Sequence, residues 1–127
     1  MITILSLQEI ESQFATNEHR RALYDLLVSQ IEQTQRQYDN LSVLLFGSFI
    51  TKKEIPEDID LIVSYACSEE RYSGPPARVA GKQVDLHRYR LDTLSAAAAL
   101  RRFNGEPRNV EKGIAVPPEE VIAVKLN

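Results

Sequence analysis

The sequence has little cysteine and histidine, no tryptophan and no long apolar run. The single cysteine, Cys67, excludes an intrachain disulfide and a cysteine-rich metal site. The two histidines, His19 and His87, are far apart in sequence, which disfavours a zinc site. No window approaches the roughly 20 apolar residues of a membrane span, and the first residues lack the basic flank of a signal peptide. We therefore expect a cytoplasmic protein that has no membrane partner.

The sequence also lacks a surplus of positive charge. Its formal net charge is -3, and this argues against bulk DNA binding because proteins that grip a phosphate backbone are usually basic. A nucleotide as substrate is not excluded. A length of 127 residues suits one compact domain, so we expect a single domain over 1–127. With 43% hydrophobic and 26% charged residues, the composition is that of a globular chain.

Hydrophobic periodicity predicts two helices in the first third of the chain. Residues 6–9 read Ser-Leu-Gln-Glu, the form of a capping box, and predict a short helix to about Phe14. Thr16-Asn17 breaks that helix and offers a cap for a second one over about 18–38. Its apolar residues recur at steps of three and four and form one stripe: Leu23, Leu26, Leu27, Ile31, Thr34 and Tyr38.

The rest of the chain predicts strands and one further helix. Apolar runs predict buried strands over 41–46 and 58–65, and a polar, turn-rich loop over 66–76. The segment 77–90 predicts a hairpin that turns near Ala80-Gly81. Asp92 or Thr93 can cap a third helix that ends at Asn104-Gly105. The tail offers two strand-like runs around Pro117-Pro118, whose pairing the sequence leaves open.

Two carboxylates stand within the second apolar run. Asp58 and Asp60 are two residues apart, so on a strand they point to one face with their Cα atoms about 7 Å apart. Like charges held this close raise each other's proton affinity, and a divalent cation removes that penalty. Hard oxygen ligands suit Mg²⁺ or Mn²⁺. On its own, Asp58 also fits an ordinary strand entry after Pro56.

The other polar residues of interest complement this pair. Gly47 and Ser48 follow the first strand directly, where a glycine permits close approach of a ligand and a turn can aim N–H groups at phosphate. Lys52 and Lys53 are within reach of a triphosphate, although a solvated turn is the more common role for lysines in such a position. Asp85, on a neighbouring strand, can add a third carboxylate that positions or deprotonates a hydroxyl. We interpret His87 as a histidine on the strand face.

Together these residues resemble the nucleotidyltransferase superfamily typified by DNA polymerase beta. Its pattern is a strand that ends in Gly-Ser, about ten residues, an apolar-flanked Asp-x-Asp and a later third carboxylate. Here the parts read "LLFGS", "EDIDLIV" and "QVDLH". The resemblance implies an α/β nucleotidyltransferase-like fold, with a small mixed sheet and helices mainly on one face. Its core would span about 18–90, and 91–127 would form a C-terminal helix and strand extension.

The resemblance also implies the site and the reaction. Gly47 and Ser48 would hold the phosphates of a nucleoside triphosphate, ATP above all, and Asp58, Asp60 and Asp85 would bind the metal ions. The expected enzyme transfers a nucleoside monophosphate to a hydroxyl of a protein or RNA.

The small size is similar to minimal nucleotidyltransferases, which often act as antitoxins of HEPN-type toxins. The common minimal form carries small residues and an arginine after Gly-Ser, whereas this chain reads "FITKKEIPED". The alternative is a weak or inactive binding module that keeps the fold and neutralises or regulates a protein partner.

Overall fold

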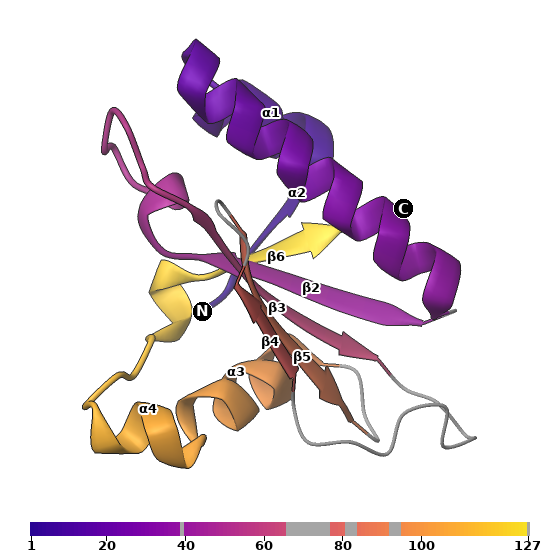
Figure 1. Cartoon of the computed structure of the whole chain (residues 1–127), viewed down its shortest axis with the longest axis vertical. Coiled ribbons are helices and arrows are strands. Elements are labelled where there is room, and N and C mark those ends of the chain that lie inside the picture. Colours follow the sequence, from indigo (N-terminus) through magenta and orange to yellow (C-terminus); the bar gives the residue numbers. More distant parts are fainter. Residues whose placement is uncertain (39, 66–76, 81–83, 92–94, 127) are drawn as a thin grey trace.

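The computed structural model describes residues 1–38, 40–65, 77–80, 84–91 and 95–126. Within these ranges the chain forms one sheet covered by helices on both faces (Figure 1). The elements are β1 (Thr3–Ser6), α1 (Leu7–Phe14), α2 (Glu18–Gln37), β2 (Leu41–Phe46), the 3-10 turn η1 (Ser48–Ile50), β3 (Ile59–Tyr65), β4 (Ala77–Ala80), β5 (Val84–Arg90), α3 (Ala96–Asn104), α4 (Pro107–Glu111), the 3-10 turn η2 (Pro118–Glu120) and β6 (Ile122–Lys125).

The sheet is mixed, and its strand order is β1-β6-β2-β3-β5-β4. β2 is antiparallel to both of its neighbours, β3 and β6. β3 and β5 run parallel, as do β1 and β6. β4 pairs with β5 as an antiparallel hairpin. The predicted class, a small α/β protein with a mixed sheet, is therefore confirmed.

Each face of the sheet buries its own hydrophobic cluster. Ile59 and Leu61 of β3 pack in the cluster that includes α1 and α2. Ile62 packs in the other cluster, against Leu100 and Phe103 of α3. Helices α1 and α2, with 8 and 20 residues, thus lie on one face, and α3, with 9 residues, covers the other (Figure 1). Because side chains alternate along a strand, Asp60 belongs to the α3 face.

Most predicted elements form where the sequence pattern placed them. Ser6 and Glu9 make the reciprocal hydrogen bonds of a capping box at the start of α1. Asn17 caps α2 by accepting from the Arg20 N–H at 2.8 Å. β2 has the predicted bounds, and β3 begins one residue later than predicted. The loop expected over 66–76 and the turn at Gly81 lie outside the described residues.

Two expectations for the C-terminal third are wrong or incomplete. Ser95, rather than Asp92 or Thr93, caps α3, and its side chain accepts from Ala98 N–H at 3.0 Å. The strand-like run before Pro117 forms no strand. The Asn104 side chain takes both backbone hydrogen bonds of Val116, which a neighbouring strand would otherwise make. Its amide donates to Val116 O and its oxygen accepts from Val116 N–H, both at 2.9 Å.

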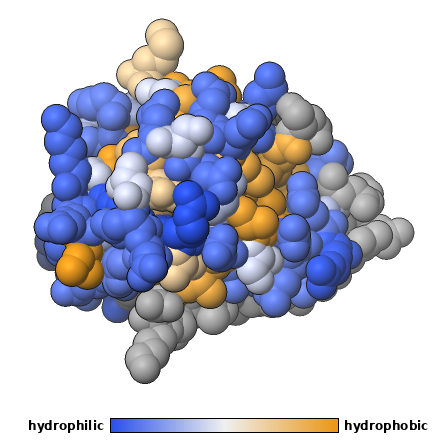
Figure 2. Space-filling model, turned by 90° about the horizontal axis from the view of Figure 1, so that it is seen from above, coloured by the Kyte–Doolittle hydropathy of each residue, from blue (hydrophilic) through white to orange (hydrophobic). Residues whose placement is uncertain are grey.

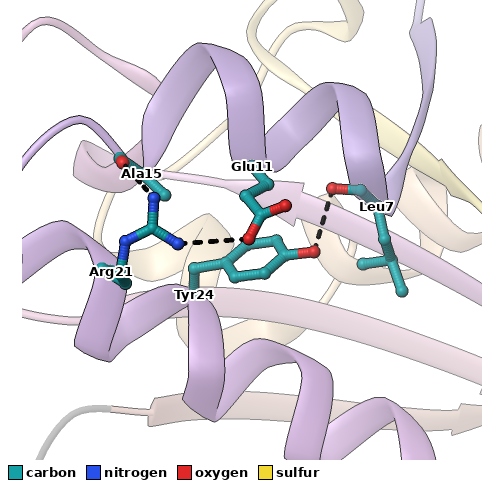
Figure 3. A network of polar contacts seen from close by, with 5 residues as sticks. All are labelled: Leu7, Glu11, Ala15, Arg21 and Tyr24. Atoms are coloured by element: carbon teal, nitrogen blue, oxygen red, sulfur yellow. Dashed lines mark hydrogen bonds and ion pairs between the residues drawn. The ribbon is translucent and has the colours of Figure 1, made fainter.

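A polar network fastens α1 to α2 (Figure 3). The Tyr24 hydroxyl donates to the Leu7 carbonyl at 3.0 Å. Arg21 donates to Glu11 at 3.2 Å and to the Ala15 carbonyl at 3.4 Å. These contacts join the two helices at their junction, so Tyr24 has a structural role here.

The α1 and α2 side of the surface is mostly hydrophilic, with hydrophobic side chains showing in a strip between hydrophilic ones (Figure 2). This agrees with an amphipathic α2, whose buried residues recur along one side. In the described part of the chain, no helix is both long and apolar enough to cross a membrane.

On the opposite face, Tyr89 makes a pH-sensitive contact. Its buried hydroxyl donates to Glu106 Oε1. Burial raises the pKa of Tyr89, and the hydrogen bond and negative charge of Glu106 raise it further. In the unfolded chain a tyrosine titrates near pH ~10. The folded state therefore favours the neutral phenol, and the resulting stability is present below pH ~10 and lost as the pH rises.

We expect Tyr89→Phe to be about 1 kcal/mol less stable than wild type at neutral pH, because a buried hydrogen bond is lost. This deficit should shrink by about 1 kcal/mol near pH ~11, since only wild type must then keep a buried phenol neutral. Urea unfolding of both proteins across this range measures the difference. A constant difference between them would contradict the assignment.

Candidate functional site

The site begins at Gly47, where β2 ends. Its backbone has φ 84° and ψ -160°, a conformation essentially restricted to glycine. A Cβ at this position would lie 2.1 Å from Oδ2 of Asp60 and 3.0 Å from its Cγ. The Asp60 carboxylate therefore rests directly against the Gly47 main chain. The sequence related Gly47 to Asp60 only through their spacing, whereas the structure shows that they are in contact.

Asp60 and Asp85 are side by side on parallel strands. They are Cα partners in the register of β3 and β5. Neighbouring strands lie about 4.8 Å apart, and partnered residues project from the same face. Both carboxylates are partly buried. Asp58 directly precedes β3, two residues before Asp60, and is also partly buried. The three predicted carboxylates thus belong to the end of the sheet beside Gly47.

His87 borders this group on the α3 face. Its Nε2 lies 3.6 Å from Oδ1 of Asp85. The ring is buried and packs edge-on against Phe103, with centroids 4.8 Å apart, and lies 6.4 Å from the Phe46 ring. Aromatic packing therefore fixes the imidazole beside Asp85, which restricts where that carboxylate can move. The sequence pattern placed His87 on a strand face, but it did not predict the contact with Asp85.

The carboxylates form an open set of donors. Among the described residues, no group of three or more His, Cys, Asp or Glu side chains could hold a metal ion. Mg²⁺ is commonly bound by one or two carboxylates, with water and substrate phosphates as its other ligands. Asp58 and Asp60 fit such an open site, and Asp85 lies beside Asp60 on the next strand. They do not form the closed cage that a structural metal needs.

Ser48 and the two lysines occupy the segment that leaves Gly47. Ser48 opens η1, and its carbonyl accepts from Thr51 N–H at 3.1 Å and from the Thr51 hydroxyl at 2.6 Å. Lys52 and Lys53 follow on an exposed stretch. Gly47 and Ser48 are therefore adjacent to the carboxylates. Lys52 and Lys53 lie further along the loop, in a part whose carbonyls accept hydrogen bonds from residues of α2 and its cap.

Three residues at the start of α2 hold this loop, and sequence reasoning missed all of them as part of the site. Asn17 donates its side-chain amide to Glu54 O at 2.9 Å. His19 Nε2 lies 2.5 Å from the Pro56 carbonyl oxygen. Arg20 is buried and contacts several loop carbonyls. A signal for Arg20 was present, because it is in phase with the apolar stripe of its helix.

A hollow of ≈ 530 Å³ adjoins Gly47 on the β6 side. Its volume is in the range of small-molecule pockets, about 300 to 1,000 Å³. Polar residues that line it include Thr51, Glu119 and Glu120, and Phe46 is also part of its lining. Gly47 therefore stands between this hollow and the Asp60 carboxylate.

The fold and site define an α/β protein in which carboxylates of parallel strands gather beside a glycine turn. The chain belongs to a family of unknown function, DUF6932, whose model matches residues 2–115. No curated protein and no solved structure shows significant similarity to it. The matched region contains every residue of the candidate site described above except Glu119 and Glu120.

Proposed function

We propose that this protein is a magnesium-dependent nucleotidyltransferase. The observation that carries the proposal is the contact of the Asp60 carboxylate with Gly47, with Asp85 its partner on the next strand. A phosphate-binding turn and a metal-binding carboxylate must lie next to each other if one triphosphate is to contact both. The backbone of Gly47 and the carboxylate of Asp60 are adjacent in this way.

Each residue has a distinct part in the proposed reaction. The turn at Gly47 and Ser48 binds the triphosphate, and Asp58 and Asp60 supply oxygen ligands. Mg²⁺ held by these oxygens would neutralise charge on the phosphates and polarise their P–O bonds. Asp85 accepts the proton of the acceptor hydroxyl, whose oxygen bonds to the α-phosphorus. The bond from that phosphorus to the β-phosphate oxygen breaks, and pyrophosphate leaves.

Positioning carries most of the rate enhancement in such a reaction. The packing of His87 beside Asp85 keeps the proposed proton acceptor in place. The hollow next to Gly47 offers room for a nucleoside or an acceptor group. ATP and a hydroxyl on protein or RNA are the proposed substrates.

Calorimetry with Mg²⁺ and each nucleoside triphosphate tests the proposal. We expect wild type to bind at least one triphosphate only when Mg²⁺ is present, and Asp58→Asn combined with Asp60→Asn to lose this binding by at least about 100-fold. Asp85→Asn should keep binding and lower transfer about 100-fold or more, as removal of a general base does. Transfer is measured with labelled triphosphate and cell lysate.

Asp25→Asn is the matched control. Asp25 lies on the exposed side of α2 and carries the same charge, so its replacement should change neither binding nor transfer. Binding that is equal with and without Mg²⁺, or that survives the double replacement, would refute the proposed function.

A second candidate is a binding module that regulates a protein partner. It is favoured by an apolar hollow of ≈ 660 Å³ beside β1, an edge strand, where Ile4 is 66% exposed. Residues of α3 line the other side, among them Leu100. Partner binding that persists after replacement of all three aspartates would support this candidate over the enzyme.

A further inference from the structure

Arg20 is a buried cation whose described hydrogen bonds all go to main-chain carbonyls. Arg20 as a whole is only 3% exposed. Nη1 donates to Phe14 O at 3.2 Å and to Phe49 O at 2.6 Å. Nη2 donates to Thr51 O at 2.7 Å and also to Lys53 O, which Nε reaches at 3.1 Å. The guanidinium Cζ lies 5.4 Å from the centroid of the Phe49 ring.

Burial of this charge is tolerated only because the loop surrounds it. Desolvation lowers the pKa of Arg20, yet arginine remains charged in proteins. An unsatisfied buried ion costs several kcal/mol, so its N–H donors need partners. Three of the four carbonyls come from Phe49, Thr51 and Lys53, at alternate positions of one loop. That spacing requires the backbone to curl around the planar guanidinium.

The loop held in this way is the one that leaves the Gly47 turn. In a trans peptide the N–H points opposite to the C=O, so carbonyls directed at Arg20 direct the following N–H groups away from it. Those N–H groups belong to Ile50, which donates to the Gly47 carbonyl at 3.4 Å, and to Lys52 and Glu54. Arg20 therefore sets the direction in which the loop presents donors and the lysine side chains. Asn17 and His19 extend the same hold to Glu54 and Pro56.

We propose that Arg20 is a positioning residue for the nucleotide-binding loop. By binding three loop carbonyls, it fixes the segment that carries Ser48, Lys52 and Lys53 against α2, ready for an anionic ligand. This inference rests on the proposed function for the identity of the ligand. The ordering of the loop by Arg20 is independent of that identity.

Arg20→Lys tests the inference, because lysine keeps the charge and loses the planar fork of donors. Arg21→Lys is the matched control, since Arg21 is next in sequence and its side chain is 55% exposed. We expect Arg20→Lys to speed hydrogen exchange of amides 49–54 at least about 10-fold while β2 and β3 remain protected. Its affinity for Mg²⁺ with ATP should fall about 10-fold or more, and Arg21→Lys should change neither quantity.

The outcomes separate the two proposals. A wild-type protein that binds no triphosphate would refute the proposed function, and the exchange data would still decide whether Arg20 orders the loop. Unchanged loop exchange in Arg20→Lys, or faster exchange spread evenly over the chain, would overturn the inference. If Arg20→Lys does not fold, exchange of the wild-type Arg20 Nε–H decides. We expect it to be at least about 10-fold slower than exchange of the exposed Arg21 Nε–H without any ligand, and equal rates would overturn the inference.

Discussion

Replacement of Gly47 by alanine is expected to cost about 3 kcal/mol of unfolding free energy and to abolish magnesium-dependent nucleotide binding. With φ 84° and ψ -160°, the backbone is in a region that costs other residues about 1–3 kcal/mol. The new Cβ would also lie 2.1 Å from Asp60 Oδ2. Because nothing can remain at that distance, the carboxylate must leave its place at the turn.

A double-mutant cycle with Asp60→Ala separates strain from the clash. Without the carboxyl group of Asp60, the nearest atom to the alanine Cβ at position 47 is the Cβ of residue 60 at 3.4 Å, an ordinary contact. Gly47→Ala should therefore cost less in the Asp60→Ala background than in wild type, by at least about 0.5 kcal/mol, as is typical for residues in contact. Urea unfolding of the four proteins measures the coupling.

Gly113→Ala is the matched control for backbone strain. Gly113 has φ 70°, and an added Cβ there would meet nothing within 4 Å. It should show a strain cost without any loss of nucleotide binding. Equal costs of Gly47→Ala in both backgrounds of the cycle would contradict the clash, since the carboxylate would then move aside freely.

The contact behind this prediction shows how far sequence reasoning reached. The spacing of Gly47, Asp58 and Asp60 between two apolar runs is a local pattern, and strand alternation assigns each side chain a face. Because β2 and β3 are consecutive and antiparallel, the end of β2 at Gly47 lies beside the start of β3 at Asp60. The register that makes Asp85 the partner of Asp60 is not local, because it depends on the parallel pairing of β3 with β5, two strands that are not consecutive in the chain.

Some of the elements that the sequence pattern missed depend on distant partners. β1 holds four residues and is stabilised by pairing with β6, from the opposite end of the chain. Its sequence, "TILS", is too short to show a period of two. The run before Pro117 has strand-like residues, but the Asn104 side chain satisfies the Val116 backbone instead. Propensity cannot reveal such a competitor.

The loop after Gly47 is the clearest case of a missed long-range cause. Its sequence reads as a solvated turn, and the lysines are indeed exposed. Its conformation depends on Arg20, about thirty positions earlier, whose phase on the apolar stripe was the one available sign. Such an arginine has to find acceptors inside the protein, and here the acceptors are the carbonyls of the candidate nucleotide loop.

Phe49 anchors the same loop from the side of the core, and Phe49→Ala is expected to cost about 3–5 kcal/mol, the usual range for a buried phenylalanine. The residue is 0% exposed, and its ring lies 6.1 Å from that of Phe14. Truncation leaves a cavity beneath Arg20 and removes the ring that faces its guanidinium. Urea unfolding measures the loss, which is large against the 5–15 kcal/mol typical of a domain.

Ile55→Ala is the matched control, because Ile55 belongs to the same loop and is 61% exposed. Its replacement should change stability by no more than about 0.5 kcal/mol, as for most surface substitutions. Phe49→Leu should fall between the two, since it restores part of the volume. If Phe49→Ala were no worse than Ile55→Ala, the loop would not be anchored in the core, and Arg20 alone would have to account for its conformation.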